Sequence, residues 1–182
     1  MACESIIAVG LNNCTKFTGG LSELYVIAFK DLKKLTGSNE VYSIDAMTKL
    51  IDEIGIVTAK QFVQIAISPK ASNGITVGAT IDEAAGTFFF NPTVSFMLRG
   101  LTKENAEFIK TAGSQPVAFV AKDRNGIYIA VGLDGSTTMS ALDGGTGLTA
   151  EEGQNVTLTF TGISNELVQH VDPTIIADIT AP

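Results

Sequence analysis

Several segments of the chain alternate apolar and polar residues with the two-residue period of a half-buried β-strand. Asn155–Gly162 alternates most regularly, with apolar side chains on one face and threonines on the other. Gln61–Ser68 and Ile75–Asp82 alternate in the same way, and a polar loop that contains Pro69 and Gly74 separates them. This spacing predicts that the two segments pair as a β-hairpin.

Other segments favour strands for different reasons. Leu24–Phe29 is apolar at every position, which predicts a strand buried on both faces. Val41–Ile56 mixes helical and strand-like spacing, and the absence of a cap favours strands. Thr87–Phe90 and Val94–Leu98 form a long apolar segment interrupted by Asn91-Pro92. Because proline has no N–H to donate, we expect this strand to be bulged, split or at an edge.

One helix and one tight turn have clear local signals. Thr102 is a suitable N-cap for a helix with one apolar face, and Gly113 is placed to end it. The turn Asp123–Gly126 joins two apolar strands, Val117–Lys122 and Ile127–Leu133. Its Asn-Gly pair supplies the positive φ angles of a hairpin.

The rest of the chain has weaker patterns. Asp134–Gly153 is rich in Gly, Ser and Thr, so we interpret it as a long loop that orders against a neighbouring subunit. Val171–Ile179 is interpreted as a last strand or an extended arm. Together these elements predict one domain over residues 1–182, mainly β (α+β). We expect an antiparallel sandwich or barrel-like core with one flanking helix, long loops, and extended N- and C-terminal arms.

Composition adds a hint of assembly. Hydrophobic residues make up 45% of the chain and the mean hydropathy is +0.28, while charged residues make up only 17%. Soluble domains average roughly 25% charged residues, so folding is expected to leave apolar surface exposed. The formal net charge is −7, and Lys33-Lys34 is the only adjacent basic pair. This balance disfavours direct binding of nucleic acid, which needs clustered cations.

Residues with chemical potential are few. The single histidine, His170, lies near Asp172 but has no nucleophile at a recognisable spacing. The glycines of Asp143–Gly147 lack the lysine of a phosphate-binding loop, and the acidic residues around them lack the spacing of a calcium loop. We therefore expect no enzymatic activity, no catalytic residue, no metal and no cofactor.

The termini and cysteines favour synthesis in the cytoplasm. Cys3 and Cys14 are interpreted as free thiols, since two cysteines make neither a disulfide scaffold nor a zinc site. The N-terminus lacks the positive region of a signal peptide, and no apolar stretch reaches the roughly 18 residues of a membrane span.

Exposed strand edges in such a protein invite pairing with other chains. The three consecutive phenylalanines at 88–90 must alternate between faces, so the strand is either buried on both sides or presents a ring that anchors a subunit contact. The candidate oligomer-interface residues are Val63, Ile65, Ile75, Val77, Phe88, Phe89, Phe90, Leu142 and Leu148.

The order of these features resembles that of phage tail tube proteins. The resemblance covers most of the chain but contains no invariant motif, so it assigns no role to any residue. It is carried by Asn12–Cys14 and Gly19-Gly20 before Leu24–Phe29, the strands Gln61–Ser68 and Ile75–Asp82, the helix Thr102–Ala112 with the hairpin after it, and the strand Val156–Gly162 followed by a polar turn before Val171.

The resemblance implies a virion protein made in the cytoplasm of a bacterial host. Its partners would be copies of itself in stacked hexameric rings and other phage tail proteins, with no membrane involved. DNA would pass through the channel without specific binding, and an acidic protein suits this role because it repels phosphate. The resemblance also implies that Gln61–Asp82 supplies a long hairpin and Asp134–Gly153 an inter-ring loop.

Other assignments share the fold class. A capsid decoration protein, a head–tail connector or a fibre-base component would also be β-rich and lack catalytic residues. A surface β-sandwich that binds glycan or protein is a further alternative. The missing signal peptide argues against it, and the absence of tryptophan weakens a sugar-stacking site.

Overall fold

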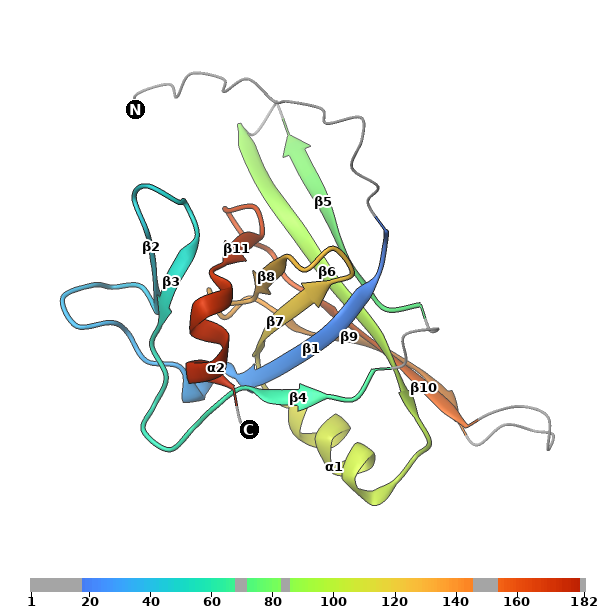
Figure 1. Cartoon of the computed structure of the whole chain (residues 1–182). Helices are drawn as coiled ribbons and strands as arrows, with labels where there is room; N and C mark the ends of the chain where they lie inside the picture. Colours follow the sequence, from blue (N-terminus) through green and yellow to red (C-terminus); the bar gives the residue numbers. More distant parts are fainter. Residues whose placement is uncertain (1–17, 68–71, 83–85, 146–153, 181–182) are drawn as a thin grey trace.

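The computed structural model describes residues 18–67, 72–82, 86–145 and 154–180. Their strands form a seven-stranded and a four-stranded sheet, which confirms the predicted mainly β fold (Figure 1). The larger sheet has the order β2 (Tyr42–Ile44), β3 (Ile51–Ile54), β11 (Gln169–Val171), β8 (Tyr128–Val131), β7 (Val117–Asp123), β1 (Leu21–Ala28) and β4 (Val63–Ile65). The smaller sheet has the order β5 (Gly74–Asp82), β6 (Thr87–Arg99), β10 (Asn155–Thr161) and β9 (Thr138–Gly145). Neighbouring strands are antiparallel except β3 and β11, which are parallel.

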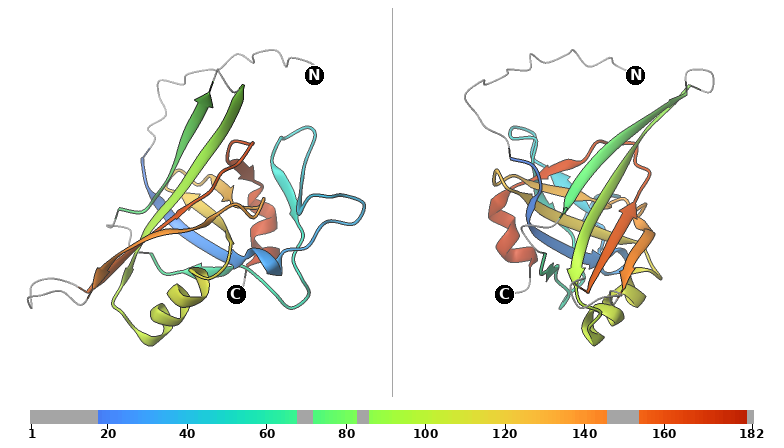
Figure 2. Two further views of the ribbon diagram at one scale, coloured as in Figure 1. Left: turned by 180° about the vertical axis from the view of Figure 1, so that it is seen from behind. Right: turned by 90° about the vertical axis from the view of Figure 1, so that its right-hand side faces the viewer.

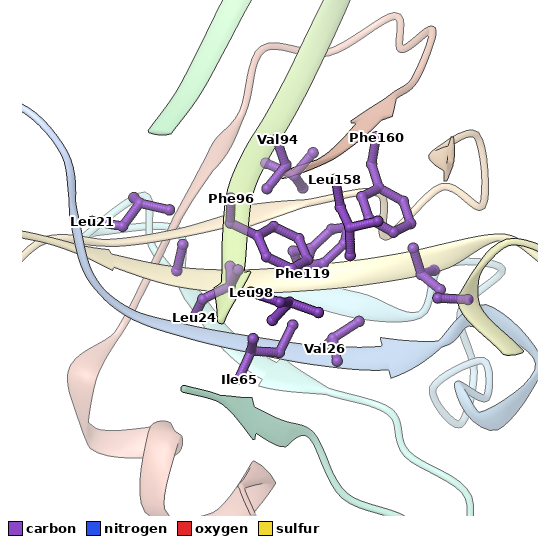
Figure 3. Packing of buried hydrophobic residues seen from close by; sticks show 14 of the residues in the cluster. Leu21, Leu24, Val26, Ile65, Val94, Phe96, Leu98, Phe119, Leu158 and Phe160 are labelled. Carbon is purple, nitrogen blue, oxygen red and sulfur yellow. The ribbon is translucent and has the colours of Figure 1, made fainter. Parts of the chain in front are cut away.

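The first hydrophobic core lies between the two sheets, as in a sandwich (Figure 3). Its centre is a cluster of three fully buried rings, Phe96 on β6, Phe119 on β7 and Phe160 on β10. The ring centroids of Phe119 and Phe160 are 5.0 Å apart, and those of Phe96 and Phe160 are 5.9 Å apart. These rings join the two sheets directly.

The second core covers the opposite face of the seven-stranded sheet. On β1, Leu24 and Val26 belong to the first core while Tyr25 and Ile27 belong to the second. This arrangement confirms the prediction that the apolar segment from Leu24 is buried on both faces. The second core is closed in part by α2 (Ile176–Ile179), whose first and last residues are buried in it.

The predicted helix and hairpin are both confirmed. Helix α1 spans Lys103–Ala112, and the Oγ1 atom of Thr102 caps it by accepting a hydrogen bond from the Asn105 N–H at 3.2 Å. Strands β7 and β8 are joined by the predicted turn, where Oδ1 of Asp123 accepts a hydrogen bond from the Ile127 N–H at 2.8 Å. Gly126 has a φ of 89°, but Asn125 does not have a positive φ, so the positive φ angles expected of the Asn-Gly pair are found at the glycine alone.

The predicted hairpin between Gln61–Ser68 and Ile75–Asp82 is wrong. Among the described residues, β4 pairs with β1, while β5 pairs with β6, so the two segments belong to different sheets. The interruption expected at Asn91-Pro92 is also wrong, because β6 continues through both residues. The ladder with β10 ends at Thr93, but the same edge of β6 continues to pair with the segment after β10, where the Gly162 N–H donates to the Pro92 carbonyl at 3.0 Å and Phe90 exchanges backbone hydrogen bonds with Ser164. Pro92 takes part in this pairing as an acceptor only, since it has no N–H to donate.

Two further segments differ from their predictions. The expected loop Asp134–Gly153 contains β9, which pairs along β10; residues 146–153 lie outside the described residues. The C-terminal segment is neither a strand nor an extended arm beyond β11. It forms a 3-10 turn, η2 (Pro173–Ile175), and then α2, because Oδ1 of Asp172 caps the turn by accepting a hydrogen bond from the Thr174 N–H at 2.8 Å. The structure therefore has a second short helix besides α1. The expected N-terminal arm falls mainly on residues 1–17, outside the described residues.

Candidate assembly surfaces

Strand β5 and the first half of β6 form a two-stranded arm that extends beyond the rest of the molecule (Figures 1 and 2). At its base, Val94 on β6 is fully buried in the first core. Side chains two residues apart on a strand share a face, and so do residues directly opposite each other. The face of the arm that continues from Val94 carries a row of apolar residues, and we call it the apolar arm face. It consists of Val77, Ala79, Ile81, Phe88, Phe90 and Pro92.

The apolar arm face is largely exposed. The exposed fractions are 66% for Ile81, 51% for Phe88 and 38% for Val77. The Phe88 ring contacts the Phe90 ring edge-on, with the centroids 4.8 Å apart. On the opposite face, the Asn91 side-chain amide donates a hydrogen bond to Oγ1 of Thr80 at 2.8 Å. The arm thus has one apolar and one mainly polar face, and its apolar face is covered at Pro92, which is buried, but exposed at Val77, Ile81 and Phe88.

A second apolar surface is a groove of about 1210 Å³ between β4 and α1. Its lining includes Val63 and Ile65 from β4, Phe108 from α1 and Leu98 from β6. Val63 is opposite Val26, a residue of the first core, so its side chain points to the same side of the sheet. Val63 is nevertheless 58% exposed. The groove is therefore a place where the first core is open to solvent.

The outer edge of β4 is open as well. Within the described residues, β4 pairs on one side with β1. Just before β4, the Phe62 N–H donates to the carbonyl of Ile179 at 2.8 Å, but none of the described strands lies along the outer edge of β4 itself. Strand β5 likewise forms the open end of the smaller sheet. Open edges of this kind can accept a strand from another chain.

The predicted interface residues divide among three places. Val63 and Ile65 line the groove, whereas Ile75, Val77, Phe88 and Phe90 follow the arm on the side of the first core. Phe89 points to the other face of the arm, and Leu142 is half exposed on the edge strand β9. Leu148 lies outside the described residues.

The structure overturns one of the two interpretations of the phenylalanine run. A strand buried on both faces is wrong, since Phe88 is half exposed and Phe89 and Phe90 are only partly buried. The most exposed large apolar residue of the arm face, Ile81, is missing from the interface prediction. Its signal was present in the sequence, because Ile81 continues the alternation of Ile75 and Val77.

A polar cluster on the seven-stranded sheet is the strongest candidate for proton chemistry. Nζ of Lys122 lies 3.1 Å from Oε1 of Glu23, and the Tyr25 hydroxyl donates to Oε2 of Glu23 at 2.8 Å. Burial and the Glu23 carboxylate raise the pKa of Tyr25 to about 12. Partial burial raises the pKa of Glu23, but hydrogen bonds from Tyr25 and Lys122 outweigh it and lower the pKa overall. At neutral pH Glu23 is a carboxylate, Tyr25 a neutral phenol and Lys122 an ammonium, and these are the forms that make the contacts described. The cluster is therefore suited to structure rather than to proton transfer.

Other sites for chemistry are sparse in the part of the chain that the structure describes. Within it, no group of three or more His, Cys, Asp or Glu residues could hold a metal ion. His170 is exposed on β11, and the nearby Asp172 is occupied in capping η2. None of the described helices has the length and apolar character needed to cross a membrane.

The fold and these surfaces define a mainly β protein of two packed sheets with a projecting apolar arm. Comparisons with protein-family models, curated protein sequences and solved structures give no match for the chain.

Proposed function

We propose that this chain is a structural protein of a phage virion that assembles with copies of itself into stacked rings and forms the tail tube. The observation that carries the proposal is the exposed apolar arm face. Ile81 and Phe88 lie directly opposite each other, and both are more than half exposed. Such a row on a two-stranded arm is costly in water unless a partner covers it. In the virion the partners are other copies of the chain and further tail proteins.

The charge of the chain supports a conduit for DNA. The sequence has 19 acidic and 12 basic residues, and a channel of negative character repels phosphate groups. DNA then passes without being retained, whereas a basic channel would bind it. The proposal does not involve catalysis, a cofactor or a membrane.

Electron microscopy of the purified chain tests the proposal, together with light scattering over a wide range of protein concentration. We expect rings or tubes with a central hole, and a mass that fits six subunits per ring. Assemblies without a hole would favour a capsid decoration, connector or fibre-base protein instead. A monodisperse monomer at every concentration would refute self-assembly and favour a surface binding module that uses the groove.

A further inference from the structure

We propose that the apolar arm face of one copy packs into the groove between β4 and α1 of a second copy. This inference rests on the proposed function, because it specifies the contact by which copies of the chain assemble. It commits to one partner, a second copy of this chain, and to two surfaces that the structure describes.

The apolar arm face is complementary in chemistry to the groove. The groove is an open side of the first core, lined by apolar residues such as Val63 and Phe108. The apolar arm face is an extension of the sheet face that covers the same core within each copy. Arm residues such as Ile81 and Phe88 are therefore of the kind that already packs against this core, and they are presented on the same scaffold.

The backbone is suited to the same contact. β4 and β5 are the outer strands of their sheets within the described residues, so each has an open edge. If β5 of one copy adds to the edge of β4 of another, main-chain hydrogen bonds continue the larger sheet. In the register that we propose, the Val77 and Ile81 side chains lie on the same side as Val63 and point toward α1. A single contact geometry thus pairs the two open strand edges and buries the two apolar surfaces.

The two surfaces lie at opposite ends of the molecule, since the arm projects at one end while β4 and α1 lie at the other (Figures 1 and 2). One copy cannot bring its own arm to its own groove. Contact between copies is therefore head to tail, and each copy both donates an arm and receives one. A head-to-tail contact that does not close on itself propagates as a filament, which suits the stacking direction of a tube.

Single cysteines test the contact in the full chain. In a background with Cys3→Ser and Cys14→Ser, one variant carries Ile81→Cys and another carries Val63→Cys. Both positions are exposed, so folding is expected to be retained, and circular dichroism verifies it. With a short bis-maleimide linker, we expect a cross-linked dimer only when the two variants are mixed. A single chain that carries both cysteines is expected to give a ladder of oligomers.

The opposite face of the arm supplies a matched control. Thr80→Cys replaces Ile81→Cys in the same mixture, one residue away on the more polar face, and we expect little cross-linking. In a separate assay of light scattering against concentration, Ile81→Asp is expected to raise the concentration for half-assembly by roughly 10- to 100-fold. This factor is what burying one large apolar side chain is worth. Thr80→Asp is expected to change it far less.

The outcomes separate the inference from the proposed function. A dimer formed by the Ile81→Cys variant alone would overturn the inference, because the arms would then pair with each other. Rings or tubes without cross-links in the mixture would also overturn it while leaving the tail tube proposal intact. A chain that stays monomeric in microscopy and light scattering would refute both.

Discussion

Replacing Phe160 by alanine removes a ring from the centre of the first core. Phe160 is fully buried on β10, and its ring lies 5.0 Å from that of Phe119 and 5.9 Å from that of Phe96. The change therefore opens a cavity between the two sheets and also removes two ring-to-ring contacts. No polar partner is lost, so the effect measures packing alone.

The expected cost is about 4 kcal/mol of unfolding free energy. Truncation of a buried Phe to Ala costs about 3–5 kcal/mol, and aromatic pairs add about 0.5–1.5 kcal/mol each beyond their buried area. We expect about 4 kcal/mol rather than the lower end of the range for Phe-to-Ala changes, because two ring pairs are broken. For a chain of this length, about 4 kcal/mol corresponds to a fall in Tm of about 8–16 °C. This is a large share of the roughly 5–15 kcal/mol that stabilises a typical domain.

Phe88→Ala is the matched control, because it is the same chemical change at a half-exposed position of β6. It is expected to cost less than about 1 kcal/mol, chiefly from the lost contact with Phe90. The assay is guanidinium denaturation followed by far-ultraviolet circular dichroism, since the chain has no tryptophan for fluorescence. It is run at concentrations where light scattering shows monomers. Equal costs for Phe160→Ala and Phe88→Ala would refute the assignment of the core.

Three further predictions concern single local features. Thr102→Ala removes the side-chain cap of α1 and is expected to cost about 1 kcal/mol in chemical denaturation, whereas Thr102→Ser retains the cap and the stability. Gly144 has a φ of 138° and a Cβ there would lie 2.2 Å from a backbone oxygen of β10, so Gly144→Ala is expected to cost about 1–3 kcal/mol, while Gly145→Ala meets nothing within 4 Å and should be neutral. Partial burial raises the pKa of Asp123, but hydrogen bonds from the Asn125 side chain and from backbone N–H groups of the turn lower it overall. The ionised Asp123 side chain therefore contributes to stability above the ordinary aspartate pKa of about 3.9, and this contribution is lost as the pH falls below that value. Asp123→Asn should flatten the acid side of a plot of denaturation midpoint against pH. An unchanged slope would contradict this prediction.

Features that depend on a few adjacent residues could be predicted from the sequence. The cap at Thr102 and the turn at Asp123–Gly126 form through contacts within about four positions of the chain. The strand β10 could be located because its alternation reports which side chains are buried, and the structure buries every second residue from Val156 to Phe160. Such signals do not depend on what the rest of the chain does.

Partners of strands could not be predicted in the same way. The alternation of Gln61–Ser68 and Ile75–Asp82 indicates which residues share a face, but a neighbouring strand is chosen by contacts far apart in sequence. Leu24 opposite Ile65 places β4 in the larger sheet. The short connection between β4 and β5, which looked like a hairpin loop, leads from one sheet to the other.

Strand β9 lacked any apolar period, which is why it was expected to be a loop. Its side chains are mostly exposed, and its pairing with β10 depends on the backbone. Gly144 permits the close approach, because any side chain there would collide with Asn155. The C-terminal turn, by contrast, had a usable signal, since Asp172-Pro173 combines an N-cap residue with a proline in the first turn.

The candidate surfaces show where sequence patterns stop being informative. Val94 and Phe88 lie on the same strand and the same face, yet Val94 is fully buried and Phe88 is 51% exposed. The alternation is identical at both, because it records that a face is apolar and not what covers it. Only the three-dimensional structure shows where the opposing sheet ends.

The position at which the opposing sheet ends has a physical consequence. A sheet with one apolar face is stable when a second layer covers that face, and this holds for the base of the arm, where Phe96 packs against Phe119. Beyond the buried Pro92 the same strands continue with the same pattern, but Ile81 and Phe88 are more than half exposed. At the other end of the molecule, the groove beside Val63 is a place where a layer is missing from the same core. The head-to-tail contact that we propose completes both layers at once, so a single interaction accounts for the exposure of Ile81 and Phe88 on the arm and of Val63 beside the groove.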